Sequence, residues 1–343
     1  MTVAQIAALA GERLPWPDPV SRFAIDRMIG RTRRRLAGRS FMSEPEFAAE
    51  MADYPVAMNV EAANAQHYEV PAAFFGLVLG PQRKYSCCLY DDGAGTLAEA
   101  EEHALEATAR NAGLADGQRI LELGCGWGSL SLWMAARYPA AIITAVSNSH
   151  SQRAYITGEA VRRGLGNLHV VTADMNNFVP TGRHDRVVSV EMFEHMSNWR
   201  ALLARLRAAL VPDGRLFLHV FAHDSVPYRF RVDDRADWIA RHFFTGGIMP
   251  SHGLIRQFSD VFSVEGAWRW SGRNYQQTAD AWLVNFDRNA DAIAEIMTET
   301  YGPDARLWQR RWRLFFLATS GLFGHGGGQP WGVSHYRLVP AAA

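Results

Sequence analysis

The sequence predicts an α/β protein with a Rossmann-like, doubly wound sheet, an N-terminal helical cap and an insertion over the substrate site. Between residues 118 and 222, short apolar runs alternate with helical stretches, which is typical of parallel strands with helices on both faces. One of these runs leads into three closely spaced glycines, Gly124, Gly126 and Gly128. Ligands in such folds lie beyond the carboxyl ends of the strands, and we expect the site there.

The composition indicates an ordinary globular enzyme. The 343 residues are 48% hydrophobic and 20% charged, and Lys+Arg equals Asp+Glu at 35 each, so no binding to nucleic acid is expected. The cysteines are Cys87, Cys88 and Cys125, which form neither a disulfide framework nor a CxxC metal site. No apolar stretch approaches the roughly 20 residues of a spanning helix, and the N-terminus lacks signal-peptide order. We expect a cytoplasmic protein without a metal.

Residues 1–100 show helical periodicity and predict the cap, with breaks around Pro15–Pro19, Ser43–Pro45 and Gly80–Pro81. Within this segment, seven arginines between Arg22 and Arg39 are interleaved with apolar residues. They predict a basic amphipathic helix, whose apolar stripe either packs on the body of the protein or touches anionic lipid. We favour packing on the body and keep peripheral membrane contact as the alternative.

Residues 101–343 form the predicted α/β domain. Its expected strands are 119–123, 141–146, 168–171, 186–190 and 215–221, with a final strand around 333–339. After residue 222 the alternation gives way to a segment rich in aromatic residues and glycine. We expect this segment, about 223–310, to cover the substrate site.

The glycine turn predicts the cofactor. Alternate glycines let the backbone turn sharply and approach a ligand without a Cβ. A dinucleotide fingerprint needs its third glycine three residues after the second, and that position is Ser129. The spacing Glu-x-Gly-x-Gly-x-Gly instead resembles motif I of methyltransferases that use S-adenosylmethionine.

Polar residues after the next two strands are candidates for the rest of the cofactor. The second strand, 141–146, is followed by Ser147 rather than an acid, so the neutral residues Ser147, Asn148 and Gln152 are expected to bind the ribose hydroxyls. After the third strand, Asp174 is expected to bind the adenine amine and Met175 to pack on the ring. Asp174 is equally suited to capping a helix.

The fourth strand delivers the acid–base candidates Glu191, Glu194 and His195. In a helix these residues would share one face, and two carboxylates beside an imidazole suit proton transfer from an amine. The alternative is that the acids only stabilise a helix start, which leaves His195 unexplained. His219, at the end of the fifth strand, must have its ring nitrogens satisfied, either by a site wall or by structural partners.

With these segments the chain resembles the cyclopropane fatty-acid synthase superfamily of methyltransferases, and within it the coclaurine N-methyltransferase branch. The resemblance is collinear over roughly residues 60–340. The motifs that carry it are Tyr85-Ser86-Cys87-Cys88, Gly124–Gly128, Asn148-Ser149 with Gln152, Glu191–Met196, Phe243–Ser251, Tyr275 with Thr278 and Trp282, and Leu322-Phe323-Gly324.

The resemblance implies a class I S-adenosylmethionine-dependent methyltransferase with Tyr85 and Ser86 at the cofactor. Two arms of the superfamily differ in their acceptor. Fatty-acyl synthases methylate a double bond with the help of bicarbonate, in a pocket that Cys87, Glu194, His219 and Tyr275 match. The amine-methylating arm carries Glu-x-x-Glu-His where the lipid arm has Gly-x-x-Glu-His, and Glu191 places the chain in the amine arm.

We therefore expect methyl transfer to the nitrogen of a small, possibly aromatic, amine. Glu194 and His195 are expected to deprotonate or orient the amine, Glu191 to attract it beside the cofactor, and His219 and Tyr275 to complete the catalytic pocket. The alternative is methyl or methylene transfer to an unsaturated acyl chain, with bicarbonate bound. Asn274, where histidine is usual, departs from the pattern. The sequence does not define the oligomeric state.

Overall fold

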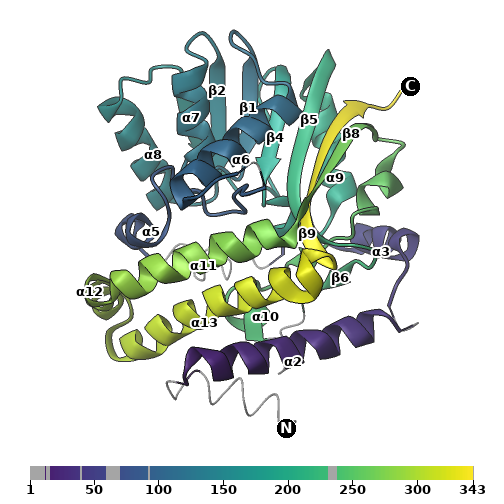
Figure 1. Ribbon diagram of the computed structural model, residues 1–343. Coiled ribbons are helices and arrows are strands. Elements are labelled where there is room, and N and C mark those ends of the chain that lie inside the picture. Colours follow the sequence, from purple (N-terminus) through teal and green to yellow (C-terminus); the bar gives the residue numbers. More distant parts are fainter. Residues whose placement is uncertain are drawn as a thin grey trace.

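The computed structural model describes residues 12, 16–38, 41–58, 70–91, 93–230 and 238–342. Its centre is a seven-stranded sheet of order β3-β2-β1-β4-β5-β9-β8 (Figure 1). The strands are β1 (Arg119–Leu123), β2 (Ile142–Ser147), β3 (Leu168–Thr172), β4 (His184–Val190), β5 (Leu210–His223), β8 (Phe262–Ser271) and β9 (Trp331–Pro340). β1 to β5 pair in parallel, whereas β9 runs antiparallel between β5 and β8. The predicted doubly wound α/β sheet is confirmed.

Four helices connect the parallel strands or precede them: α6 (Leu97–Ala112), α7 (Ser129–Arg137), α8 (His150–Arg162) and α9 (Trp199–Ala208). Local sequence fixes their ends. Thr96 and Glu99 form a capping box at the start of α6, and Gly113 ends that helix with a φ of 66°. Ser149 caps α8 by accepting a hydrogen bond from the backbone of Gln152. These signals place the start of α8 directly after β2.

A layer of helices covers the edge of the sheet to which the parallel strands point (Figure 1). It contains α2 (Asp18–Leu36), α5 (Ala72–Val78), α11 (Gly272–Arg288), α12 (Ala290–Tyr301) and α13 (Ala305–Gly324), with η4 (Gly302–Asp304) between α12 and α13 and η5 (His325–Gly328) after α13. An aromatic core holds these helices together, including Phe74, Trp282 and Trp312, which are nearly fully buried. The layer therefore forms the second wall of any site at the strand ends.

The basic helix α2 packs on α13. Ile29 and Leu36 on its apolar stripe are buried, as the favoured interpretation expects, while Phe23 is 63% exposed. Pro15 and Arg39, which the sequence analysis named, lie outside the described residues. Within the part of the chain that the structure describes, no helix is long and apolar enough to cross a membrane.

The segment from 223 to 310 contains elements outside the main sheet and also one strand of that sheet. It contains β6 (Tyr228–Arg229), α10 (Trp238–His242), β7 (Ile248–Met249) and η3 (Leu254–Phe258), and also α11 and α12. Strand β8 lies inside the same segment and forms an edge of the main sheet, a strand that the sequence analysis did not predict. Near the N-terminus, α3 (Glu44–Glu50) and η1 (Met51–Asp53) pack on η3 and α9. The boundaries of cap and insertion stay predictions.

Candidate active site

A cavity lies at the carboxyl ends of β1, β2 and β4, between the sheet and the helical layer. Most of the predicted site residues line it: Tyr85, Ser86, Gly124, Gly126, Asn148, Gln152, Asp174, Met175, Glu191, His195 and Tyr275. Gly128, Glu194 and His219 do not line it and lie behind its wall. The structure thus brings the cofactor candidates and the acid–base candidates to one cavity.

The three glycines of the turn have different functions. All three have positive φ, of 76°, 53° and 80° at Gly124, Gly126 and Gly128. A Cβ at Gly124 would lie 2.5 Å from Met192, and a Cβ at Gly128 would lie 2.7 Å from Ile156. Only at Gly126 is the space within 4 Å free. Gly124 and Gly126 line the cavity, and the missing Cβ atoms of Gly124 and Gly128 also allow close packing against Met192 and Ile156. Cofactor binding by the three glycines stays a prediction.

The polar groups after β2 are held in place by one another. The Ser147 hydroxyl lies 2.7 Å from Gln152 Oε1 and accepts a hydrogen bond from the backbone of Ser149. The Ser147 contact orients the Gln152 amide, which is 3% exposed. Neutral hydrogen-bonding groups therefore stand at the end of β2, and they suit ribose hydroxyls.

Asp174 lies at the next strand end and begins a turn. Its Oδ1 accepts a hydrogen bond from the backbone of Asn176 at 2.8 Å. Asn176 in turn binds the backbone N–H and C=O of Ala57 at 3.0 and 3.1 Å, and Ala57 lines the cavity. Asp174 thus caps a turn and also borders the cavity, so its two predicted uses are compatible. The two hydrogen bonds from Asn176 that hold the Ala57 backbone were not predicted.

Glu122, the acid of the glycine motif, also lines the cavity. It lies in the buried strand β1, and the Ser131 hydroxyl donates a hydrogen bond to it. Burial raises the pKa of Glu122 to about 7. The sequence analysis used this residue only to recognise the motif.

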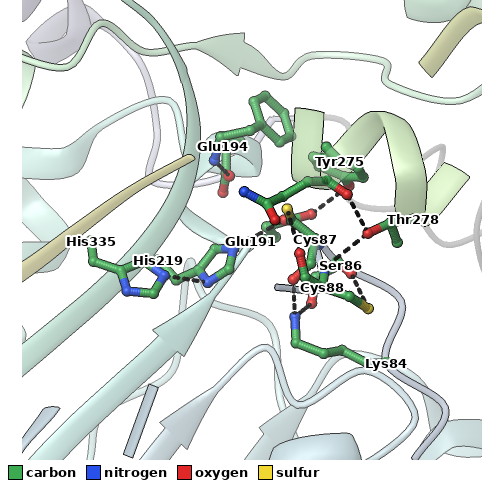
Figure 2. A network of polar contacts seen from close by, with 12 residues as sticks. Lys84, Ser86, Cys87, Cys88, Glu191, Glu194, His219, Tyr275, Thr278 and His335 are labelled. Carbon is green, nitrogen blue, oxygen red and sulfur yellow. Dashed lines mark hydrogen bonds and ion pairs between the residues drawn. The ribbon is translucent and has the colours of Figure 1, made fainter. Parts of the chain in front are cut away.

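Glu191 is the centre of the polar network at the end of β4 (Figure 2). Its Oε1 accepts hydrogen bonds from the Cys87 backbone N–H at 2.9 Å and lies 3.2 Å from His219 Nε2. Its Oε2 accepts a hydrogen bond from the Tyr275 hydroxyl at 2.7 Å. Its backbone has a φ of 48°, a conformation that costs energy for any residue with a Cβ. The fold therefore holds this side chain in place at the expense of backbone strain.

The charge of Glu191 is opposed by burial and favoured by its neighbours. Burial raises the pKa of this carboxyl, while Lys84 and the hydrogen bonds from Cys87 and Tyr275 lower it. Lys84 is buried, and its Nζ donates to Ser86 Oγ at 2.5 Å and to the Cys87 carbonyl at 2.6 Å. The pKa is raised overall, since burial is the largest effect, while the two donors Cys87 N–H and Tyr275 OH and the nearby cation favour the ionised form, because a carboxylate only accepts hydrogen bonds.

Glu194 and His195 belong to the short 3-10 turn η2 (Phe193–His195). The predicted helical face shared with Glu191 is not formed, because Glu191 precedes this turn and its positive φ redirects the chain. Glu194 is fully buried and accepts a hydrogen bond from the Phe221 N–H at 2.6 Å. Burial and the nearby Glu191 raise its pKa well above the usual range. Direct contact of Glu194 with an acceptor molecule is not supported by this placement.

His195 faces the cavity beside aromatic rings. Its ring centre lies 4.3 Å from that of Phe244. Tyr275 and Phe323 stack on one another at 4.3 Å. Further residues of this wall are Phe221, Phe230, Ile239, Met249, Phe315, Thr319 and Leu322. The contribution of α13 was visible in the sequence only through the motif Leu322-Phe323-Gly324.

The mixed sheet, with its glycine turn and a cavity at the ends of the parallel strands, has the fold of class I methyltransferases that use S-adenosylmethionine, as the match to a solved methyltransferase structure shows. The family is more specific. Residues 57–327 match the model of the mycolic acid cyclopropane synthetase family, and the chain belongs to this family.

Two groups of curated relatives are similar to the chain. The (S)-coclaurine N-methyltransferase of Thalictrum flavum subsp. glaucum is 35% identical over 285 residues, covering 82% of this chain and 79% of that protein. The cyclopropane-fatty-acyl-phospholipid synthase of Escherichia coli strain K12 is 28% identical over 276 residues, covering 80% of this chain and 67% of that protein. The predicted family and the predicted likeness to coclaurine N-methyltransferases are confirmed.

Solved structures agree with these matches. A coclaurine N-methyltransferase bound to N-methylheliamine and S-adenosylhomocysteine superimposes with a TM-score of 0.88 at 32% identity, covering 94% of this chain and 96% of that chain. The Mycobacterium tuberculosis cyclopropane synthase MmaA2 shares the fold, with a TM-score of 0.70 at 23% identity and coverages of 82% and 98%. The predicted cofactor, S-adenosylmethionine, is confirmed as that of the class.

Proposed function

We propose that the protein transfers a methyl group from S-adenosylmethionine to the nitrogen of a small aromatic amine. The observation that carries this proposal is the Glu191 carboxylate, which lines the cavity, accepts hydrogen bonds from the Cys87 N–H and the Tyr275 hydroxyl, and lies 3.2 Å from His219 Nε2. A nitrogen becomes positively charged as it is methylated, and a fixed negative charge stabilises that change. The similarity to coclaurine N-methyltransferase supports an amine acceptor.

The residues at the strand ends fit the cofactor. Open space beside Gly126 allows close approach, and the oriented Gln152 amide with Asn148 provides neutral hydrogen-bonding groups. Asp174 and Met175 border the same cavity and would hold the adenine. When bound, the cofactor supplies an electrophilic methyl group on a sulfonium.

Three polar residues have different roles where the amine would bind. His195 lines the cavity and orients the amine or accepts its proton. Glu191 provides the negative charge. Glu194 supports the wall from behind through the Phe221 backbone. The surrounding aromatic rings exclude water and favour a flat amine by stacking and cation–π contact.

Bicarbonate is unnecessary in this arrangement. The Cys87 N–H, His219 and Tyr275 all contact the Glu191 carboxylate. These are three of the four groups that match the bicarbonate pocket of the lipid arm, and here they already have an anionic partner. We infer that Glu191 takes the place of a bound anion.

The acceptor is identified by labelling without a choice of candidate. A cell lysate is incubated with the protein and isotopically methyl-labelled S-adenosylmethionine, and labelled products are found by mass spectrometry. We expect the label on the nitrogen of a small amine. Label recovered solely in lipid would contradict the proposal.

One observation favours a second function, methyl transfer to an unsaturated acyl chain at a membrane surface. Phe23 and Val20 are exposed on the basic helix α2, next to Arg27. Cosedimentation with anionic liposomes and methylation of their acyl chains would support this second function. Loss of cosedimentation in the variant Phe23→Glu would place the contact on α2.

We also propose a cytoplasmic location, because Cys87, Cys88 and Cys125 are all buried free thiols, as is usual in a reducing compartment. Fractionation of the source cells tests this proposal. Recovery from an oxidising compartment would contradict it.

A further inference from the structure

A chain of buried side chains continues from Glu191 into the interior of the protein. His219 Nδ1 lies 2.9 Å from His335 Nε2, and His335 Nδ1 lies 3.1 Å from Asn111 Nδ2. His219 and His335 are fully buried and Asn111 is 7% exposed. Figure 2 shows the two imidazoles in line with Glu191. These hydrogen-bonded side chains link the end of β4 to β5, β9 and α6.

The two imidazoles have no freedom to choose other partners. The His335 ring lies between Trp270 and Phe217, with ring centres 4.3 and 5.1 Å away. The His219 ring packs edge-on against Trp270 at 5.4 Å. Each ring nitrogen of both histidines therefore faces a partner within the chain itself.

Both histidines are neutral, because burial lowers the pKa of each ring well below its usual value. A neutral imidazole has one donor and one acceptor nitrogen, so all hydrogen bonds in this series of side chains must point the same way. If Asn111 donates to His335 Nδ1, His335 must donate from Nε2 to His219 Nδ1. His219 must then donate from its own Nε2 to the Glu191 carboxylate. The opposite direction would place a lone pair of His219 against Glu191 and require a proton on that carboxyl.

We propose that His335 and Asn111 are positioning residues that hold His219 in the tautomer that donates to Glu191. They thereby keep Glu191 ionised in the reactive site. This inference rests on the proposed function only in the use made of the Glu191 charge. The contacts among Glu191, His219, His335 and Asn111 do not depend on the proposed function.

Other charged or titratable groups also face Glu191. They are Lys84 and Cys87 on the segment before α6, Glu194 on η2 and Tyr275 on α11. A substitution of His335 leaves all four in place, since none of them is its hydrogen-bond partner. A change in Glu191 that follows this substitution is therefore assigned to the histidine chain.

The experiment compares three variants with the wild type. His335→Phe removes the donor to His219 while it fills the same flat space. His335→Gln keeps an amide N–H near the position of Nε2. His184→Gln removes another buried histidine, at the start of β4, far from the cavity end of that strand. It controls for the general cost of such a loss.

Two readouts are used. The tautomer of His219 is read from long-range ¹H–¹⁵N correlations of histidine rings, assigned with His219→Gln, and needs no acceptor. The acidic limb of kcat/KM against pH, at saturating cofactor, reports Glu191. The titration of the substrate itself is common to all variants.

We expect Nε2–H on His219 in the wild type, and its loss or mixing with the other tautomer in His335→Phe. We expect the acidic limb of His335→Phe to move up by about one pH unit, the size of one lost hydrogen bond to a charged group. His335→Gln restores both readouts, and His184→Gln changes neither. If His335→Phe does not fold, Asn111→Leu takes its place.

The proposal is overturned if His335→Phe keeps the wild-type tautomer and acidic limb, or if His335→Gln behaves like His335→Phe. A protein that shows the predicted tautomer change but methylates no amine contradicts the proposed function and leaves the role of the chain intact. The two failures are therefore distinguishable.

Discussion

Replacing Glu191 by glutamine removes its charge and keeps its shape. The Gln oxygen at the Oε1 position still accepts from the Cys87 N–H and from His219 Nε2. The amide NH₂ then faces the Tyr275 oxygen, which can accept because a hydroxyl rotates. We therefore expect Glu191→Gln to fold normally.

The size of the kinetic effect follows from the missing charge. Two unit charges about 6 Å apart at an effective dielectric constant of about 20 interact with about 3 kcal/mol. Glu191 lines the cavity, so an acceptor nitrogen lies within about this distance. Because the sulfonium of the cofactor loses the positive charge that the nitrogen gains, this energy is an upper bound, and the loss in kcat/KM for the amine is at most about 100-fold.

The assay measures release of S-adenosylhomocysteine with the amine at a fixed pH, together with the affinity for S-adenosylhomocysteine by calorimetry. S-adenosylhomocysteine has no sulfonium charge, so we expect its affinity to stay within a few-fold of wild type. A Glu191→Gln variant that retained kcat/KM within about threefold would refute the electrostatic role of Glu191.

Three further predictions concern the glycine turn, the anion position and the N-terminal segment. Gly126 and Gly128 both have positive φ, so alanine costs about 1–2 kcal/mol of stability at each position. Gly126→Ala should in addition weaken cofactor binding at least about tenfold, whereas Gly128→Ala, whose Cβ would meet Ile156 at 2.7 Å, should lower the free energy of unfolding by about 1–3 kcal/mol more. Calorimetry and denaturant titration separate the two variants, and the reverse pattern would contradict their assignment. Glycine tolerates the positive φ at position 191, so Glu191→Gly should fold. This variant should be inactive and partly rescued by added bicarbonate, because the groups around the lost carboxylate, the Cys87 N–H, His219 and Tyr275, can hold another anion. Activity assays with and without bicarbonate test this, and a lack of rescue would contradict it. The pKa of Glu12 is lowered to about 2 by its contacts with His242, Trp238 and Arg311, against the opposing effect of burial. The ionised Glu12 side chain stabilises the folded protein at pH values above the pKa of this group in the unfolded state, and this contribution is lost as the pH falls toward the folded-state pKa. Glu12→Gln should therefore lower the free energy of unfolding by about 2 kcal/mol near pH 7, and the difference from wild type should shrink below about pH 4.5. Urea titrations near pH 7 and below about pH 4.5 check this, and a constant difference would contradict it.

The sequence predicts most of the sheet because strands and helices alternate regularly from β1 to β5. Strand β8 was missed. It is a partly exposed edge strand, its pairing with β9 shifts register between Val264 and Gly266, and it lies in an aromatic-rich segment. Its local pattern was therefore attributed to the insertion rather than to the sheet.

The candidate site was predicted as a set of residues but not as a geometry. Motif spacing placed Glu191, Glu194 and His195 together, yet the positive φ of Glu191 decides which of them faces the cavity. Such a backbone angle is set by tertiary packing. His335 and Asn111 escaped notice because their contacts join residues 116 and 224 positions apart, which a single sequence does not reveal.

In the proposed reaction, the site methylates an amine nitrogen with the help of the Glu191 charge. The most direct measurement supplies purified protein and methyl-labelled S-adenosylmethionine with an aromatic secondary amine and unsaturated phosphatidylglycerol vesicles in one reaction. Mass spectrometry then locates the label. We expect label on the amine nitrogen, strongly reduced in Glu191→Gln. Label on the acyl chain, or equal labelling of the amine by both proteins, would contradict it.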